Sequence, residues 1–207
     1  LWDLPKGAVV GTSSLRRQAQ LLAVRLDLQA HPIRGNVDTR LRKLRESDAF
    51  HGIILAFAGV RRLGLEHVIT HILDIPEWLP APGQGALAVA TRADDAPMRR
   101  IASALEHGPT RAAITAERAL LIGLEGGCRV PIGACARVDG ATVVLDGLIA
   151  EPFGRVVVRD RESGPVEEAE AIGKRLASKL LAHGGAEILA MLRETEEQHV
   201  QHGTSRT

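Results

Sequence analysis

Hydrophobic and polar positions follow a repeating pattern in the first part of the chain. Short apolar runs at residues 8–10, 31–33 and 52–57 alternate with stretches in which apolar residues recur every three or four positions. The runs predict buried strands, and the periodic stretches predict helices, the last of them over residues 58–67. Strands that alternate with helices indicate a mostly parallel sheet covered by helices on both faces.

The pattern changes at PEWLPAPGQG, residues 76–85, where three prolines and two glycines mark a hinge or a domain boundary. Residues 85–91 predict one lone strand, and two helical stretches follow it over residues 96–107 and 110–124. The second of these helices is expected to start at a Thr110 cap.

The last part of the chain has the pattern of an antiparallel sheet. Alternating segments separated by turn signals predict three consecutive strands, over residues 133–139, 142–149 and 155–161. A helical region is expected from about residue 166 to 192, with a break at Gly184, and a polar, frayed tail from about residue 194.

These elements predict a protein of two fold types. We expect an α/β domain with a mostly parallel sheet over residues 1–80, and a hinge segment over residues 81–104. A small α+β domain with a three-stranded antiparallel sheet is expected over residues 105–207. The chain does not begin with Met, and we expect it to be a piece of a longer protein.

Composition and charge restrict the function classes. No apolar run approaches the ~20 residues that a membrane span needs, and the N-terminus lacks the pattern of a secretion signal. Two cysteines do not form a disulfide framework, which favours a reducing, cytoplasmic setting. The net charge of +1 and an aromatic content of 2% argue against a nucleic-acid partner.

Two polar loops at neighbouring strand ends are the first candidate site. GTSSLRR, residues 11–17, places Thr12, Ser13 and Ser14 before a helix whose first turn carries Arg16 and Arg17. Cations oppose the helix dipole there unless an anion lies in front of them, although a plain Ser cap with solvated arginines is the alternative. In open α/β sheets, ligands bind beyond the carboxyl ends of the strands.

The second loop repeats this arrangement in RGNVDTR, residues 34–40. Gly35 permits a close backbone approach, Asn36 is a candidate helix cap, and Arg34 and Arg40 flank the turn. Two such loops at one sheet edge favour an acidic ligand with several carboxylates, since no phosphate-binding glycine loop is present.

The loop EGGCRVPIG, residues 125–133, is the second candidate. Glycines and a proline around Cys128 are typical of an exposed thiol, and Arg129 favours its thiolate form, which suits covalent attachment. A structural loop cysteine is the alternative. Cys135 lies in a strand pattern and is interpreted as a small core residue. No metal site is predicted, because His67 and His71 lack a third ligand.

Six stretches together resemble the hydroxymethylbilane synthase (porphobilinogen deaminase) family, and they cover roughly residues 4–185. They are GTSSLRRQAQL (11–21), IRGNVDTRLRKL (33–44), IILAFAGVRRLGL (53–65), LPAPGQGA (79–86), TAERALL (115–121) and EGGCRVPIGA (125–134). The resemblance implies a transferase that joins four porphobilinogen molecules head to tail, with loss of ammonia, and then releases the linear tetrapyrrole by hydrolysis.

The resemblance also implies a fold and a cofactor. The first domain here corresponds to one of two lobes that look like those of periplasmic binding proteins. A dipyrromethane cofactor would be attached to Cys128 through a thioether. The residues that match the family's cofactor- and substrate-binding positions are Thr12, Ser13, Ser14, Arg16, Arg17, Arg34, Gly35, Asn36 and Arg40, with Gln84 in the hinge loop.

One departure concerns the catalytic residue of the family. The resemblance implies a catalytic Asp in a domain that would precede Leu1, and Asp27, Asp38 and Asp48 here are interpreted as solvated helix residues. We therefore expect the 207-residue chain to be inactive alone. The family is monomeric, but residues 85–102, which would return to the preceding domain, are expected to be displaced, disordered or paired with another copy.

The residues alone leave two alternatives open. The first is a module that binds an acidic small molecule without turnover. The second is a purely structural domain, which leaves the arginines of both loops without a role.

Overall fold

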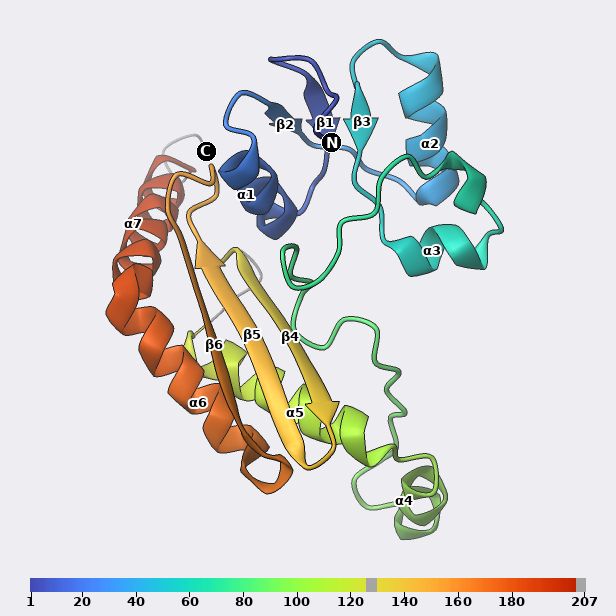
Figure 1. Ribbon diagram of the computed structural model, residues 1–207, viewed down its shortest axis with the longest axis vertical. Helices are drawn as coiled ribbons and strands as arrows, with labels where there is room; N and C mark the ends of the chain where they lie inside the picture. Colours follow the sequence, from blue (N-terminus) through green and yellow to red (C-terminus); the bar gives the residue numbers. More distant parts are fainter. Residues whose placement is uncertain (126–129, 204–207) are drawn as a thin grey trace.

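The computed structural model describes the backbone of residues 1–125 and 130–203, and side chains over residues 1–125 and 130–195. Two sheets of three strands organise these residues, and an irregular linker joins them (Figure 1). The first sheet is parallel and the second is antiparallel, so the two fold types that the hydrophobic pattern predicts are confirmed.

The parallel sheet has the strand order β2-β1-β3. Its elements are β1 (Val9–Gly11), α1 (Leu15–Val24), β2 (Gln29–His31), α2 (Val37–Glu46), β3 (Gly52–Ile53), α3 (Phe57–Arg62) and the 3-10 turn η1 (Glu66–Val68). The helix expected over residues 58–67 is wrong in its length. It ends at Arg62, because Gly64 takes a left-handed conformation with a φ of 67°.

The linker between the sheets, residues 69–107, has little regular structure. It contains α4 (Ala96–Ser103), whose N-cap is Asp95. The pattern predicted a strand over residues 85–91, but none is formed there, since none of the six strands in the described residues pairs with this segment. A strand without a neighbour has no ladder of hydrogen bonds to hold it.

The antiparallel sheet has the order β4-β5-β6 and is longer than the parallel one. Its elements are α5 (Gly108–Gly123), β4 (Ile132–Asp139), β5 (Thr142–Ala150), β6 (Val157–Pro165), η2 (Val166–Glu168), α6 (Ala169–Leu180), the π-helical turn η3 (Leu181–Gly185) and α7 (Ala186–Gly203). The break expected at Gly184 is present, with a φ of 112°. Helix α7 continues to Gly203, so regular structure extends past residue 194.

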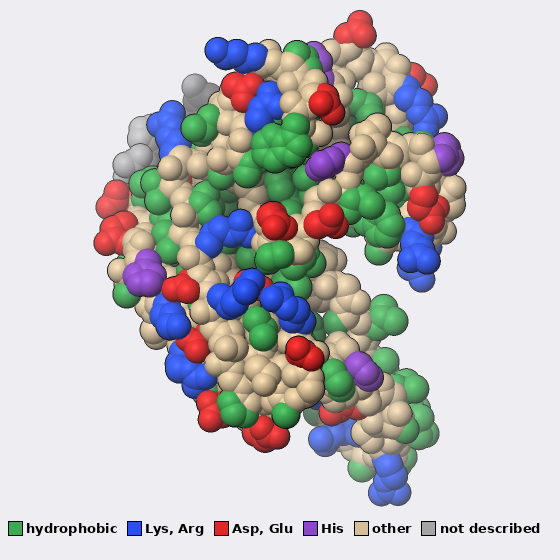
Figure 2. Space-filling view, in the orientation of Figure 1, with side chains coloured by type: hydrophobic (Ala, Val, Ile, Leu, Met, Phe, Trp, Pro, Cys, Tyr) green, Lys and Arg blue, Asp and Glu red, His purple; other side chains and the backbone are tan. Residues whose placement is uncertain are grey.

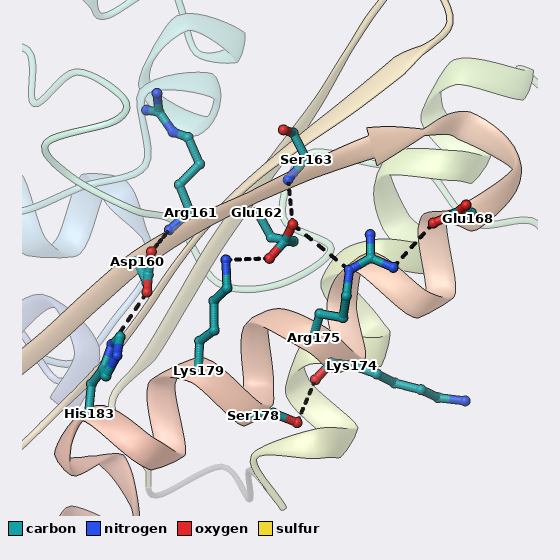
Figure 3. Close-up of polar contacts among 10 residues, drawn as sticks. All are labelled: Asp160, Arg161, Glu162, Ser163, Glu168, Lys174, Arg175, Ser178, Lys179 and His183. Atoms are coloured by element: carbon teal, nitrogen blue, oxygen red, sulfur yellow. Dashed lines mark hydrogen bonds and ion pairs between the residues drawn. The ribbon is translucent and has the colours of Figure 1, made fainter.

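Helices α5 and α6 cover one face of this sheet and form the largest core with it (Figure 1). The two helices approach closely at Gly173, where an added Cβ would lie 2.3 Å from the carbonyl oxygen of Ala116. At the surface, Glu162 on β6 forms an ion pair with Lys179 on α6 at 2.5 Å and a longer one with Arg175 (Figure 3).

Helix α1 lies against the other face of the antiparallel sheet and so joins the two halves. Ala19 on α1 and Leu79 of the linker pack with Leu148 and Ala150 of β5 in one buried cluster. Gly154 also contacts α1, and a Cβ there would lie 2.4 Å from the backbone nitrogen of Ala23. The first polar loop therefore leads into helix α1, which packs against both domains.

Basic side chains mark one face of the antiparallel sheet. Lys and Arg side chains gather over the middle of the antiparallel sheet (Figure 2), where Arg137 and Arg161 both pair with Asp146. Among the described helices, none combines the length and the apolar character needed to cross a membrane.

Candidate functional site

The two polar loops meet at one edge of the parallel sheet. Because β1 and β2 run in the same direction, the residues that follow them emerge side by side. The backbone N–H of Thr12 donates to the carbonyl oxygen of His31 at 2.8 Å. The hydroxyl of Ser13 donates to the carbonyl of Ile33 at 2.8 Å and accepts from its N–H at 3.1 Å. The expected juxtaposition of the two strand ends is therefore observed.

The hydroxyls of the first loop serve local structure. Ser14 is the N-cap of α1, and its oxygen accepts from the N–H of Arg17 at 3.4 Å. The buried Thr12 accepts from the N–H of Ser14 at 3.2 Å. Both hydroxyls shape the turn, and the Ser cap that was weighed as an alternative is present.

The two arginines of α1 point to backbone carbonyls of different segments. Nη1 of Arg16 donates to the carbonyl oxygen of Leu79 at 2.7 Å, and Nη1 of Arg17 donates to that of Ile54 at 3.0 Å. Burial lowers the pKa of Arg16 to about 10, with a further contribution from the charge of Arg17. Burial also lowers the pKa of Arg17, and the charge of Arg40 adds to this effect.

The second loop is organised around a glycine. Gly35 has a φ of 124°, and a Cβ at this position would lie 2.6 Å from the Thr39 side chain. Asn36 caps α2 by accepting from the N–H of Thr39 at 2.9 Å, as expected. Nε of Arg40 donates to the carbonyl oxygen of Gly35 at 2.8 Å. This bond turns the Arg40 guanidinium back toward the loop.

Arg34 is placed differently from the other arginines. Its carbonyl oxygen accepts from Nζ of Lys43 at 3.0 Å, while its side chain is exposed. No hydrogen bond or ion pair of that side chain is found within the described residues. Lys43 therefore adds a cation beside the second loop, in addition to the four arginines that the sequence predicts there and in the first loop.

The electrostatics of this edge fit an acidic group. The pKa of Arg16 is lowered by burial and then by the charge of Arg17, and the pKa of Arg17 is lowered by burial and then by the charge of Arg40. Within the described part of the chain, none of the three forms an ion pair with a carboxylate. Partly buried cations without a counter-charge are costly, and a ligand with several carboxylates would supply that charge. The donor set thus fits an acid-bearing cofactor or substrate.

The carboxylates of this half of the chain lie elsewhere. Asp27 was interpreted as a solvated helix residue, but it lies beyond the end of α1 and pairs with Arg25 at 2.8 Å. This bond to Arg25 lowers the pKa of Asp27. Asp38 is exposed in the first turn of α2, and Asp48 is exposed after its end. Over the described residues, no cluster of three or more His, Cys, Asp or Glu side chains could hold a metal ion.

The candidate thiol is not part of this geometry. Cys128 lies outside the described residues, so its role as an attachment point stays a prediction. Cys135 packs on the cluster that contains Ala19 and Leu79, and burial raises the pKa of its thiol. Gln84 is exposed on the linker, where its N–H closes a turn onto the carbonyl of Ala81. Among the described residues, no hydrogen bond joins Gln84 to Arg16, Arg17 or Arg40.

Two buried polar side chains were missed by the sequence interpretation. Gln20 on α1 bonds to the backbone of Leu79, and Glu117 on α5 accepts from the N–H groups of Gly83 and Ala136 at 2.6 Å and 2.7 Å. Burial raises the pKa of Glu117 despite these two bonds. Each residue lies on the buried face of an amphipathic helix. A polar residue in that position of the sequence pattern indicates a buried side chain that needs hydrogen-bond partners.

Comparisons with known proteins identify the family. Residues 1–100 match the model for the porphobilinogen deaminase dipyrromethane cofactor binding domain, and residues 111–182 match the model for the porphobilinogen deaminase C-terminal domain.

Three curated relatives carry the name porphobilinogen deaminase. The protein of Desulforudis audaxviator is 52% identical over 193 residues, that of Carboxydothermus hydrogenoformans 49% over 191, and that of Geobacter sulfurreducens 50% over 194. These alignments cover 92–94% of this chain and 61–62% of the relatives. The chain therefore spans about three fifths of the length of the relatives it matches.

Proposed function

The chain belongs to the porphobilinogen deaminase family, and from that premise we propose that it forms the cofactor-holding part of a hydroxymethylbilane synthase. The proposed reaction joins four porphobilinogen molecules head to tail with release of ammonia. The observation that carries the proposal is the placement of Arg16, Arg17 and Arg40 on the two loops at the carboxyl edge of the parallel sheet, where none of them forms an ion pair with a carboxylate among the described residues.

The chemistry of the substrate matches this cluster. Each pyrrole unit carries an acetate and a propionate, so a growing chain of pyrroles gathers carboxylates. A guanidinium binds a carboxylate through two parallel hydrogen bonds, each worth about 1.5–3 kcal/mol when the geometry is good. Arg16 and Arg17 each spend one donor on a backbone carbonyl, and this bond orients their remaining donors toward a ligand.

The cofactor belongs to the same proposal. Dipyrromethane, which would be attached through a thioether to Cys128, would supply the end of the chain to which pyrrole units are added. In this chain, Arg16, Arg17, Arg34 and Arg40 would bind its carboxylates, and Lys43 lies beside them. Ser13, Gly35 and Asn36 would act through the shape of the loops, which present backbone donors at the start of α1 and α2.

The domain boundaries are part of the proposal. Residues 1–80 would form one lobe of a pair like that of periplasmic binding proteins, and residues 105–207 the domain that carries the cofactor cysteine. Residues 81–104 would form the hinge and a packing segment. That segment would pack on a domain that corresponds to the part of the relatives not matched by residues 1–207. The exposed apolar side chains of Leu87, Val89 and Ile101 support that packing.

Several expectations stay predictions. They are the family's catalytic Asp outside residues 1–207, the inactivity of the 207-residue chain alone, its oligomeric state and a cytoplasmic setting. The alternative of a binding module without turnover is not favoured, because relatives at about 50% identity carry the name of the deaminase.

Binding and intact-mass measurements test the proposal. Porphobilinogen is titrated into the 207-residue chain and into an Arg17→Lys variant, which keeps the charge but loses the planar fork. We expect roughly tenfold weaker binding by the variant, as for one lost charge-assisted bond. In cells that make the cofactor, the chain should gain the mass of dipyrromethane, and Cys128→Ser should not. Equal binding by both proteins together with an unmodified Cys128 contradicts the proposal.

A further inference from the structure

A buried glutamine connects Arg16 of the first loop to the linker. Gln20 lies on α1 with 4% of its surface exposed, and its side-chain amide bonds to the backbone of Leu79. Its Oε1 accepts from the N–H of Leu79 at 2.8 Å, and its Nε2 donates to the carbonyl oxygen of Leu79 at 3.0 Å. Both polar backbone groups of one linker residue are thus satisfied by one side chain.

Arg16 uses the same acceptor. Its Nη1 donates to the carbonyl oxygen of Leu79 at 2.7 Å, and its own carbonyl oxygen accepts from Nε2 of Gln20 at 3.3 Å. A shift of the Leu79 carbonyl would therefore move the acceptor that fixes the Arg16 guanidinium. Gln20 holds that carbonyl directly and, through the Leu79 N–H, also holds the peptide unit that precedes it.

Leu79 is also anchored to the second domain. Its side chain is 1% exposed and packs against Leu148 and Ala150 of β5. The next residue, Pro80, accepts from the N–H of Ala134 at the edge of β4 at 3.0 Å. The linker residue that orients Arg16 is therefore held between α1 and the antiparallel sheet.

We propose that Gln20 is a positioning residue, which fixes the Leu79 peptide so that its carbonyl directs the Arg16 guanidinium toward the acidic ligand. The role of Arg16 toward that ligand rests on the proposed function. Because Leu79 also packs on β5, the antiparallel sheet influences through this residue how the parallel half binds carboxylates. Gln20 itself does not touch the ligand.

If Gln20 has a purely structural role, a different effect of its replacement on ligand affinity is expected. If Gln20 only satisfied the backbone of Leu79, its replacement would lower stability and leave a folded chain with unchanged ligand affinity. The proposal requires that Gln20 and Arg16 act on the ligand through one guanidinium. Their effects on affinity must then be coupled rather than additive.

The first experiment observes the Arg16 guanidinium by NMR without any ligand. Rotation about its terminal C–N bonds should be slow in the wild-type chain, because Nη1 is bonded to Leu79, and the signal is assigned by its loss in Arg16→Lys. Gln20→Glu keeps the size of the side chain and the acceptor for the Leu79 N–H, but it removes the donor to the carbonyl. We expect a shifted, differently restrained Arg16 signal in this variant. An unchanged signal overturns the proposal.

The second experiment is a double-mutant cycle on porphobilinogen affinity with Gln20→Leu, Arg16→Lys and the double variant. Each single change should weaken binding roughly tenfold, as for one charge-assisted hydrogen bond, and the double variant should be about as weak as either single one. Gln20→Glu replaces Gln20→Leu if the latter does not fold. Additive losses, or wild-type affinity in a folded Gln20 variant, overturn the proposal.

Gln18 provides the matched control. It is an amide on the same helix, and its Nε2 donates to the carbonyl of Pro152 at 3.1 Å, away from Arg16. Gln18→Leu should change neither the Arg16 signal nor the affinity. If Arg16→Lys binds porphobilinogen like the wild type, the proposed ligand role of Arg16 fails. The NMR comparison still decides whether Gln20 positions Arg16, so the two failures are distinguishable.

Discussion

Ser13 and Ile33 exchange two hydrogen bonds across the two polar loops, one in each direction. The Ser13 hydroxyl donates to the Ile33 carbonyl at 2.8 Å and accepts from the Ile33 N–H at 3.1 Å. One side chain thereby continues the pairing of β1 and β2 beyond the last backbone bond between them. The spacing of the loops, and with it the spacing of their arginines, depends on this hydroxyl.

Replacing Ser13 with Ala tests that dependence. The change leaves both the donor and the acceptor of Ile33 without their partner, and each lost bond costs about 0.5–1.5 kcal/mol in the free energy of unfolding. We expect a lower denaturation midpoint and weaker porphobilinogen binding. Ser13→Thr, which keeps the hydroxyl, serves as the control. Unchanged denaturant unfolding in Ser13→Ala would contradict the assigned role.

The contact between α5 and α6 gives a prediction about stability. In Gly173→Ala, the new Cβ would lie 2.3 Å from the Ala116 carbonyl oxygen and 2.6 Å from the Ala119 Cβ, so the helices must separate. Such overpacking costs about 1–3 kcal/mol. Gly108→Ala is the control, because nothing lies within 4 Å of its Cβ position. Thermal unfolding should separate the two variants clearly, and a Gly173→Ala chain as stable as Gly108→Ala would contradict the close helix contact.

Patterns of apolar residues predicted both sheets because each pattern reports local burial. The alternating segments of β4, β5 and β6 face a helix layer on one side, whereas the apolar run of β1 is the central strand of its sheet and packs on α1. Boundaries were less predictable. The run at residues 52–57 contains only the short strand Gly52–Ile53, because β1 offers few residues for pairing.

The candidate site was predictable in its residues but not in its contacts. Arg16 and Arg17 stood out because cations in a first helical turn oppose the dipole. Nothing in their spacing indicated that Arg16 would bond to Leu79, sixty-three residues away. The same is true of Gln20, which bonds to the backbone of Leu79, and of Glu117, which accepts from the backbone N–H groups of Gly83 and Ala136. Backbone partners leave no signature in the sequence.

The pH dependence of stability should report on Glu117. Burial raises its pKa above the ordinary value of 4.5, so the folded chain holds this proton more tightly than the unfolded chain does. The contribution of the group to stability is therefore greatest at low pH and declines as pH rises from about 4.5 through the folded pKa.

Glu117→Gln removes this titration. The variant also turns an amide N–H₂ group toward the N–H of Gly83 or Ala136, which costs about 1–3 kcal/mol. Denaturant unfolding of both proteins between pH 4 and 7 checks the prediction. The stability difference, wild type minus variant, should decrease as pH rises. A difference that is independent of pH would show that Glu117 has the same pKa in the folded and unfolded chain.

The exposed apolar segment of the linker leads to a prediction about self-association. Leu87 is 99% exposed, and Val89 and Ile101 are 63% and 64% exposed. Exposed apolar side chains of this kind favour contacts with another protein surface, and in the 207-residue chain the available surface is a second copy. We expect sedimentation velocity to show concentration-dependent association, and Leu87→Asp should shift it toward the monomer without changing the denaturation midpoint. Leu26→Asp, at a 69% exposed position on the parallel half, is the control and should leave association unchanged. A wild-type chain that stays monomeric at every concentration would show that this segment does not drive pairing between copies.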